Sequence, residues 1–408
     1  IKLMRLAAIL SLSISIIYIL FQSLQPAFYM HLYPDIFVFH ARSTYFWEHL
    51  SLSNLGHNEY QPGAIIFFIL VGLSFMFDSS LETFKWGLFT ANIILIMLTA
   101  LLMHKMGKTY GVILLSSLLI FLGPILLFRF DLLVIFLLTL VFYFWEKGHH
   151  EVAVAILPLG VLVKVFPILF LPYLLFVSFR KYRLVNAVYL LSIFLSTLIT
   201  YFLIYTIVLQ IGFKETLVSY NFHNMKSVAT ESVWASLFYI INIVKGIPLP
   251  NMESDFGINA IARGEVYPSI QFYNYFWILP MGVLNLFYFL KKKTVHGIDY
   301  QFIILNMLVF LIFSKVFSNQ YWAWFLFLIP LLKLKTLQTR GWLINIFLII
   351  LTTILHTFIF PLNYTEWLNV LARKNVDWML IWVMIISSLI LPILAVRIFI
   401  DVFKNDHE

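Results

Sequence analysis

Residues 6–24 read LAAILSLSISIIYILFQSL and residues 86–103 read WGLFTANIILIMLTALLM. Similar runs recur along the 408-residue chain, in which 62% of residues are hydrophobic, and the mean hydropathy is +0.93. A helix needs about 20 apolar residues to cross the hydrocarbon core of a bilayer. Because the backbone of a spanning segment must satisfy its own hydrogen bonds, such runs predict helices. The sequence therefore predicts an all-α, polytopic membrane protein.

Turn signals between the apolar runs predict about twelve transmembrane helices in a single integral membrane domain, residues 1–408. Basic clusters favour the inner side of a membrane. The clusters expected there are His104–Lys108, Arg180–Arg183, Lys291–Lys293 and Lys333–Arg340. This layout puts both termini in the cytoplasm and the protein in the plasma membrane. Residues 63–77 are expected to form a re-entrant or surface-lying hairpin, and residues 6–24 the first span instead of a signal peptide.

Two outer segments follow from this layout: a short one, residues 26–62, and a long one, residues 211–270. The short segment is rich in polar residues in a chain that is only 11% charged, and we expect it to be the catalytic loop. The long segment matches no motif known to us. No acceptor-binding motif is therefore assigned within it.

Composition and motifs exclude several classes of protein. The chain has no cysteine, so it has no disulfide, thiolate metal site or cysteine nucleophile. Its net charge of +8 lies mostly in the short clusters that orient the spans and does not indicate nucleic-acid binding. Motifs of nucleotide hydrolases and zinc proteases do not occur. The histidines lack metal-site spacing, so no metal or cofactor is expected, although a divalent metal requirement is left open.

Ionisable residues from separate outer segments are expected on one side of the membrane, where they indicate a shared wet cavity. Asp35 is the candidate general base, and its alternative is a solvated carboxylate or a helix N-cap. Arg129 is a candidate phosphate ligand, unless it pairs locally with Asp131. Lys164 interrupts a long apolar stretch beside a proline break. It either binds an anionic headgroup or snorkels to the membrane surface.

Five short motifs occur in an order that resembles the GT-C superfamily of polytopic glycosyltransferases, and within it the polyprenol-phosphate-mannose-dependent mannosyltransferases of glycosyltransferase family 87. The motifs are Pro34-Asp35-Ile36-Phe37, Glu59-Tyr60-Gln61-Pro62, Arg129-Phe130-Asp131, Lys164-Val165-Phe166-Pro167 and Ser318-Asn319-Gln320-Tyr321. The second carries an inserted glutamine, and the last has asparagine where the family often has proline. The resemblance covers about Met30 to Leu332.

This resemblance implies a glycosyltransferase that uses a polyprenyl-phosphate sugar, of mannose or another hexose or pentose, on the extracytoplasmic face. The acceptor is a lipid or a glycan, and the product is inverted at the anomeric carbon. Asp35 is the expected base, and Arg129 and Lys164 the expected phosphate ligands. The candidate sugar- and acceptor-binding residues are Arg42, Glu59, Tyr60, Asp131, His223, Asn319 and Gln320. The alternative is a multi-span transporter or lipid flippase that performs no chemistry.

Overall fold

The computed structural model describes residues 2–52, 60–255, 258–266, 270–292, 297–371 and 377–404. These residues form two compact units. The first unit contains Ile1–Phe222 and Lys293–Ile298, and the second contains His223–Lys292 and Asp299–Glu408. Helices build both units, and the described residues contain one sheet, a two-stranded hairpin. The prediction of an all-α membrane protein is confirmed in this general form.

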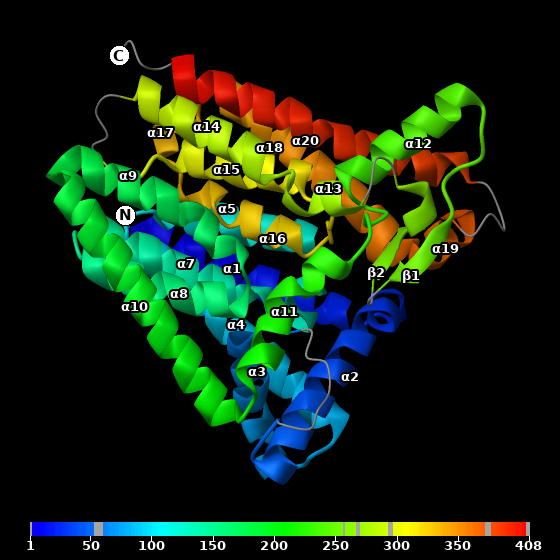
Figure 1. The fold of residues 1–408 in the computed structure, drawn as a ribbon, viewed down its shortest axis with the longest axis horizontal. Helices are drawn as coiled ribbons and strands as arrows, with labels where there is room; N and C mark the ends of the chain where they lie inside the picture. The colour runs from blue at the N-terminus through cyan, green and yellow to red at the C-terminus, as the bar shows by residue number, and fades with distance from the viewer. Residues whose placement is uncertain are drawn as a thin grey trace. The chain divides into compact units, whose positions relative to one another are not determined.

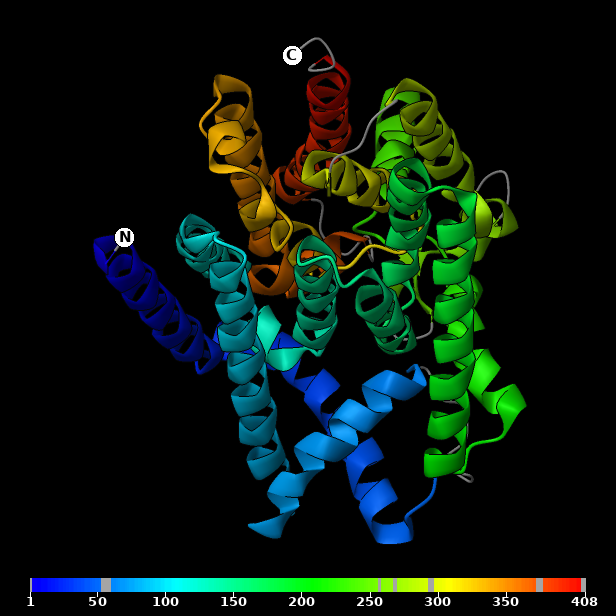
Figure 2. The ribbon, with the colours of Figure 1, turned by 90° about the vertical axis from the view of Figure 1, so that its left-hand side faces the viewer.

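The first unit consists of helices that vary widely in length (Figures 1 and 2). In chain order they are α1 (Lys2–Ser23), α2 (Pro26–His49), α3 (Pro62–Val71), η1 (Gly72–Met76), α4 (Leu81–Lys105), α5 (Thr109–Leu122), α6 (Ile125–Phe128), α7 (Asp131–Glu146), α8 (His150–Val163), η2 (Phe166–Phe170), α9 (Leu171–Tyr182) and α10 (Leu184–Leu209). Helix α11 (Phe213–Met225) leads into the second unit. The pairs α1 with α5, α7 with α8, and α8 with α10 pack side by side.

The second unit contains the remaining helices and the hairpin. They are α12 (Val233–Lys245), β1 (Met252–Asp255), β2 (Ile258–Ile261), η3 (Arg263–Glu265), α13 (Ile270–Tyr275), α14 (Ile278–Lys291), α15 (Tyr300–Phe313), α16 (Tyr321–Leu326), η4 (Ile329–Leu331), α17 (Leu334–Leu337), α18 (Arg340–Thr357), the π-helical turn η5 (Phe358–Leu362), α19 (Tyr364–Leu371) and α20 (Trp378–Lys404). The strands pair antiparallel, with Met252 opposite Ile261. Helix α20 packs against α12, α15 and α18.

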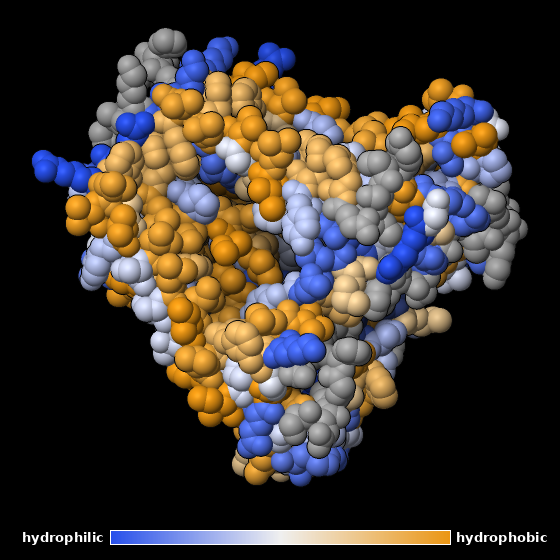
Figure 3. Space-filling view, in the orientation of Figure 1, coloured by the Kyte–Doolittle hydropathy of each residue, from blue (hydrophilic) through white to orange (hydrophobic). Residues whose placement is uncertain are grey.

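Within the described residues, five helical segments are long and apolar enough to cross a membrane. They are Lys2–Ser23, Leu81–Lys105, Leu184–Leu209, Arg340–Leu362 and Trp378–Lys404. Six further apolar helices are shorter, from 10 to 17 residues. A helix of 14 residues is about 21 Å long, less than the core thickness of about 30 Å. The exposed side of α10 is apolar over most of its length, as a lipid-facing helix requires (Figure 3).

The two segments that we expected on the outer side contain more helix than the sequence predicts. Most of the expected loop 26–62 is helix α2, although Pro34 lies inside it. Pro34 removes one backbone hydrogen bond, but Leu32, Ile36 and Phe39 are buried along one side and hold the helix against its neighbours. The segment 211–270 contains α11, α12 and the hairpin. Sequence reasoning missed these elements because polar residues alternate with short apolar runs in both segments.

Candidate functional site

Asp35 lies on the inner side of α2, between the buried residues Leu32 and Phe39. Its Oδ2 is 2.6 Å from the NH2 nitrogen of Arg129, and 24% of the Asp35 side chain is exposed. The alternative of a helix N-cap is wrong, because α2 begins nine residues earlier, after Gln25. Asp35 is therefore a half-buried, ion-paired carboxylate in a helix.

Arg129 and Asp131 flank Phe130 at the turn between α6 and α7. Asn92 on α4 holds this turn, since its Nδ2 donates hydrogen bonds to the carbonyl oxygens of Leu127 (3.0 Å) and Arg129 (2.8 Å). The Arg129 backbone is extended, and α7 begins at Asp131. A carboxylate at a helix N-terminus is stabilised by the helix dipole. The turn thus presents a cation and an anion on either side of a buried aromatic ring.

Lys164 occupies the break predicted between two short helices. Helix α8 ends there, where the Lys164 N–H donates to the Gly160 carbonyl at 2.9 Å and the backbone becomes extended. Two glycines allow the close packing around this break. A Cβ on Gly160 would lie 3.3 Å from Cγ of Pro167, and a Cβ on Gly63 of α3 would lie 2.9 Å from the Leu162 carbonyl carbon. Real Cβ contacts almost never fall below 3.0 Å.

The ion pairs join residues that are distant in the sequence. Lys164 Nζ lies 2.6 Å from Asp131 Oδ1, with 12% of the lysine side chain and 1% of the aspartate side chain exposed. Arg129 pairs with Asp35. A local pair between Arg129 and Asp131 is therefore not the arrangement in this structure. We call Asp35, Arg129, Asp131 and Lys164 the charge cluster.

The charge cluster contains two cations and two anions, so its formal charges balance. Burial raises the pKa of the Asp35 carboxyl, although the positive charges of Arg129 and Lys164 act in the opposite direction. The negative charge of Asp131 also raises the pKa of Asp35, because it opposes ionisation of that carboxyl. Nε of Arg129 is buried and has no hydrogen-bond partner among the described residues. The guanidinium therefore keeps a donor for a further acceptor.

Aromatic rings form one wall of the charge cluster. Phe130 lies against Phe39, Tyr60 and Phe68, with ring centroids 5.3–5.8 Å apart. Nζ of Lys164 lies 4.6 Å from the centroid of the Phe130 ring, in the range of a cation–π contact. The rings exclude water from one side of the ions, which strengthens electrostatic interactions there.

The other predicted site residues fall into three groups. Arg42 lies on α2 seven residues after Asp35, on the same side of the helix by its spacing. Glu59 and the side chain of His223 lie outside the described residues. Asn319 and Gln320 belong to the second unit.

Asn319 has a structural role in that unit. Its Nδ2 donates to the carbonyl oxygens of His356 (3.1 Å) and Phe360 (2.7 Å), where α18 gives way to the π-helical turn. Oε1 of Gln320 is buried and has no hydrogen-bond partner among the described residues. Oδ1 of Asn319 is likewise buried and has no hydrogen-bond partner among the described residues.

The sequence analysis named Tyr60 but missed Asn92 and the phenylalanines of the aromatic wall, Phe39, Phe68 and Phe130. Asn92 is the one asparagine in the apolar run 86–103, and its side chain is fully buried. A buried amide in a spanning helix must find partners, so this position was a detectable signal. Phe39 and Phe130 gave none, because phenylalanine is abundant throughout the chain.

No group of three or more histidine, aspartate or glutamate residues that would hold a metal is present among the described residues. No protein-family model matches the chain, and no curated protein matches it. The interpretation of the site therefore depends on its own geometry.

Proposed function

We propose that the protein is a membrane glycosyltransferase that moves a sugar from a polyprenyl-phosphate donor to a lipid or glycan acceptor. The observation that carries this proposal is the charge cluster. It combines a carboxylate of raised pKa with two cations, at the edge of apolar helices. A general base works best when its pKa lies nearer the working pH. Arginine and lysine are the side chains that bind phosphate. The order of motifs that resembles the GT-C superfamily supports the same reaction.

The residues have separate roles in the proposed reaction. Asp35 removes the proton from the acceptor hydroxyl as its oxygen bonds to the anomeric carbon. The bond from that carbon to the phosphate oxygen breaks on the opposite side, so the configuration inverts. Arg129 and Lys164 stabilise the charge that returns to the leaving phosphate. Asn92 positions Arg129 by holding its carbonyl.

Because the charges balance, the phosphate of the sugar donor must compete with the two carboxylates for the two cations. Arg129 and Lys164 each contact a carboxylate before substrate binds. A phosphate that takes Arg129 removes the ion-pair partner of Asp35, so the carboxylate becomes a stronger base. We infer that donor binding precedes proton removal from the acceptor.

The membrane layout belongs to the proposal. We place the charge cluster on the extracytoplasmic face, both termini in the cytoplasm, and the protein in the plasma membrane. The shorter apolar helices would complete about twelve passes by pairing end to end, as α8 and α9 do around Lys164. The basic clusters would then lie mostly inside.

A transporter of anionic lipids or sugar phosphates is the second candidate. The buried pair of Lys164 and Asp131 favours it, because transporters place paired ionisable residues among apolar helices. A transporter moves its substrate unchanged, whereas a transferase makes a new glycosidic bond.

The test uses purified protein in proteoliposomes with radiolabelled polyprenyl-phosphate sugars and a membrane lipid extract. The proposal predicts a new labelled product that carries the sugar without its polyprenyl phosphate. Labelled donor that crosses the bilayer unchanged, with no product from any donor, would establish the transporter instead.

A further inference from the structure

Helix α12 (Val233–Lys245) has ends that its sequence determines. The Ser232 side chain accepts a hydrogen bond from the Ala235 N–H at the N-terminus, and Gly246 has a φ of 65° at the C-terminus. These are a standard N-cap and a left-handed C-cap. The 13 residues between them make a helix of about 20 Å. Helix α12 is therefore too short to cross a core of about 30 Å.

The two sides of α12 differ in what they contact. Ala235 and Tyr239 are buried on the side that packs against α20. Leu237, Ile241 and Val244 are exposed on the other side, at a spacing of four and three residues. Val244 is 81% exposed, and Ile247 just beyond the helix is also exposed. Water does not favour such a row of large apolar side chains.

The start of α20, against which α12 packs, has the features of a membrane boundary. Its first turns expose Trp378, Met379 and Trp382, and the exposed apolar residues continue along α20 to Ile400. Tryptophan is enriched at the level of the lipid headgroups. Figure 1 shows α12 beside this part of α20, and the two helices share a buried cluster that includes Tyr239 and Ile381. The exposed row thus belongs to a helix that packs directly against the candidate membrane span α20.

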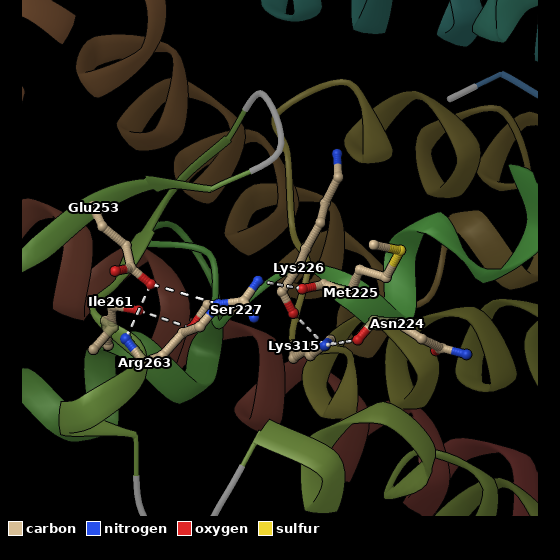
Figure 4. A network of polar contacts seen from close by, with 8 residues as sticks. All are labelled: Asn224, Met225, Lys226, Ser227, Glu253, Ile261, Arg263 and Lys315. Carbon is tan, nitrogen blue, oxygen red and sulfur yellow. Dashed lines mark hydrogen bonds and ion pairs between the residues drawn. The ribbon is translucent and has the colours of Figure 1, made fainter. Parts of the chain in front are cut away.

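The attachment of α12 to the unit is firm. In the segment before it, Ser227 Oγ donates to the Ile261 carbonyl at 2.8 Å, and Arg263 donates to the Met225 carbonyl at 2.7 Å (Figure 4). Lys315 Nζ donates to the Asn224 carbonyl at 3.0 Å. These contacts join the segment that precedes α12 to the hairpin region and to the residues that follow α15. They fix the orientation of α12, and of its exposed row, within the second unit.

We propose that α12 lies in the interfacial layer of the bilayer, with Leu237, Ile241 and Val244 among the lipid acyl chains. Lys245, next to this row at the C-terminal end, would extend to the lipid phosphates, as lysines at membrane surfaces do. The occupant of this surface is phospholipid. Helix α12 then rests on the membrane and is not part of a water-exposed loop. This inference does not depend on the proposed glycosyl transfer.

The test uses nitroxide labels on single cysteines, since the natural chain has none. Val244→Cys is the probe, and Asn251→Cys, exposed beyond the same helix, is the matched control. The whole protein is placed in nanodiscs of phosphatidylcholine and phosphatidylglycerol. Relaxation of the label by oxygen and by a water-soluble nickel chelate is then compared. A thermal-unfolding curve that matches the parent shows that each labelled protein is folded.

We expect oxygen to relax the label at 244 several-fold more than the nickel chelate does, and the order to reverse at 251. A label at 244 that the nickel chelate relaxes as strongly as the one at 251 would place α12 in water. A label at 244 that is immobilised and shielded from both reagents would show that protein covers the row. Either result would overturn the proposal.

Discussion

Replacing Lys164 with methionine tests the buried ion pair. Sequence alone predicts that Lys164→Met keeps the fold, because a long side chain remains at an apolar position. The structure changes this expectation, because only 1% of the Asp131 side chain is exposed and the nearest cation would be lost. Removing one partner of a buried pair costs about 3–5 kcal/mol. The cation–π contact with Phe130 adds about 1 kcal/mol. We therefore expect a marked loss of stability.

The double variant Lys164→Met/Asp131→Leu separates the lost pair from the lost side chain. It leaves no uncompensated charge, so its free energy of unfolding should lie within about 2 kcal/mol of the parent. Unfolding by sodium dodecyl sulfate in mixed micelles, followed by circular dichroism, measures all three proteins. The order of stability expected is parent, double variant, single variant. A single variant as stable as the parent, or a double variant as unstable as the single one, would refute a buried ion pair at this place.

Three further predictions concern other residues. Arg129→Gln should raise the donor KM, measured by donor titration, since a phosphate ligand is lost; an unchanged KM argues against that role. Burial raises the pKa of Glu231, in the turn before α12, from 4.5 to about 7. The contribution of Glu231 to the free energy of unfolding is fully present below pH 4.5 and is lost as the pH rises to 7, because the buried carboxyl must then ionise. Glu231→Gln, which cannot ionise, should therefore raise the melting temperature at pH 8 and not at pH 4. Equal shifts of the melting temperature at both pH values would contradict this. An impermeant thiol reagent on intact cells should label a cysteine at position 35 and not one at 292, and the reverse pattern would invert the layout.

The long apolar helices could be predicted because their signal is local. Helices α4, α10 and α20 each contain a long, mainly apolar run with polar or charged residues near its ends. The break near Lys164 was predictable too, because the lysine interrupts the apolar run and the residue before Pro167 disfavours a helical backbone. Helix α2 was not, because Pro34 and several polar residues give it the composition of a loop. Its helical form depends on the buried row Leu32–Ile36–Phe39, which only tertiary packing reveals.

The residues of the charge cluster could be predicted, but not their partners. Ionisable side chains stand out in an apolar chain, and their energetic cost brings them together. Arg129 and Asp131 are two residues apart, which favours a local pair in a sequence-based argument. The turn held by Asn92 separates them, and each pairs with a residue on another helix. Partner choice is thus a property of the fold.

The most direct test of the account measures glycosyl transfer and donor affinity together in Asp35→Asn protein. Asparagine keeps the size of the side chain but cannot accept the proton, so transfer should fall about a hundredfold to ten-thousandfold. Donor affinity should be kept or increased, because Arg129 no longer pairs with a carboxylate. Glu48→Gln, exposed on the same helix, is the control and should transfer at the parental rate. Folded Asp35→Asn protein that transfers sugar within a few-fold of the parent would contradict the central claim.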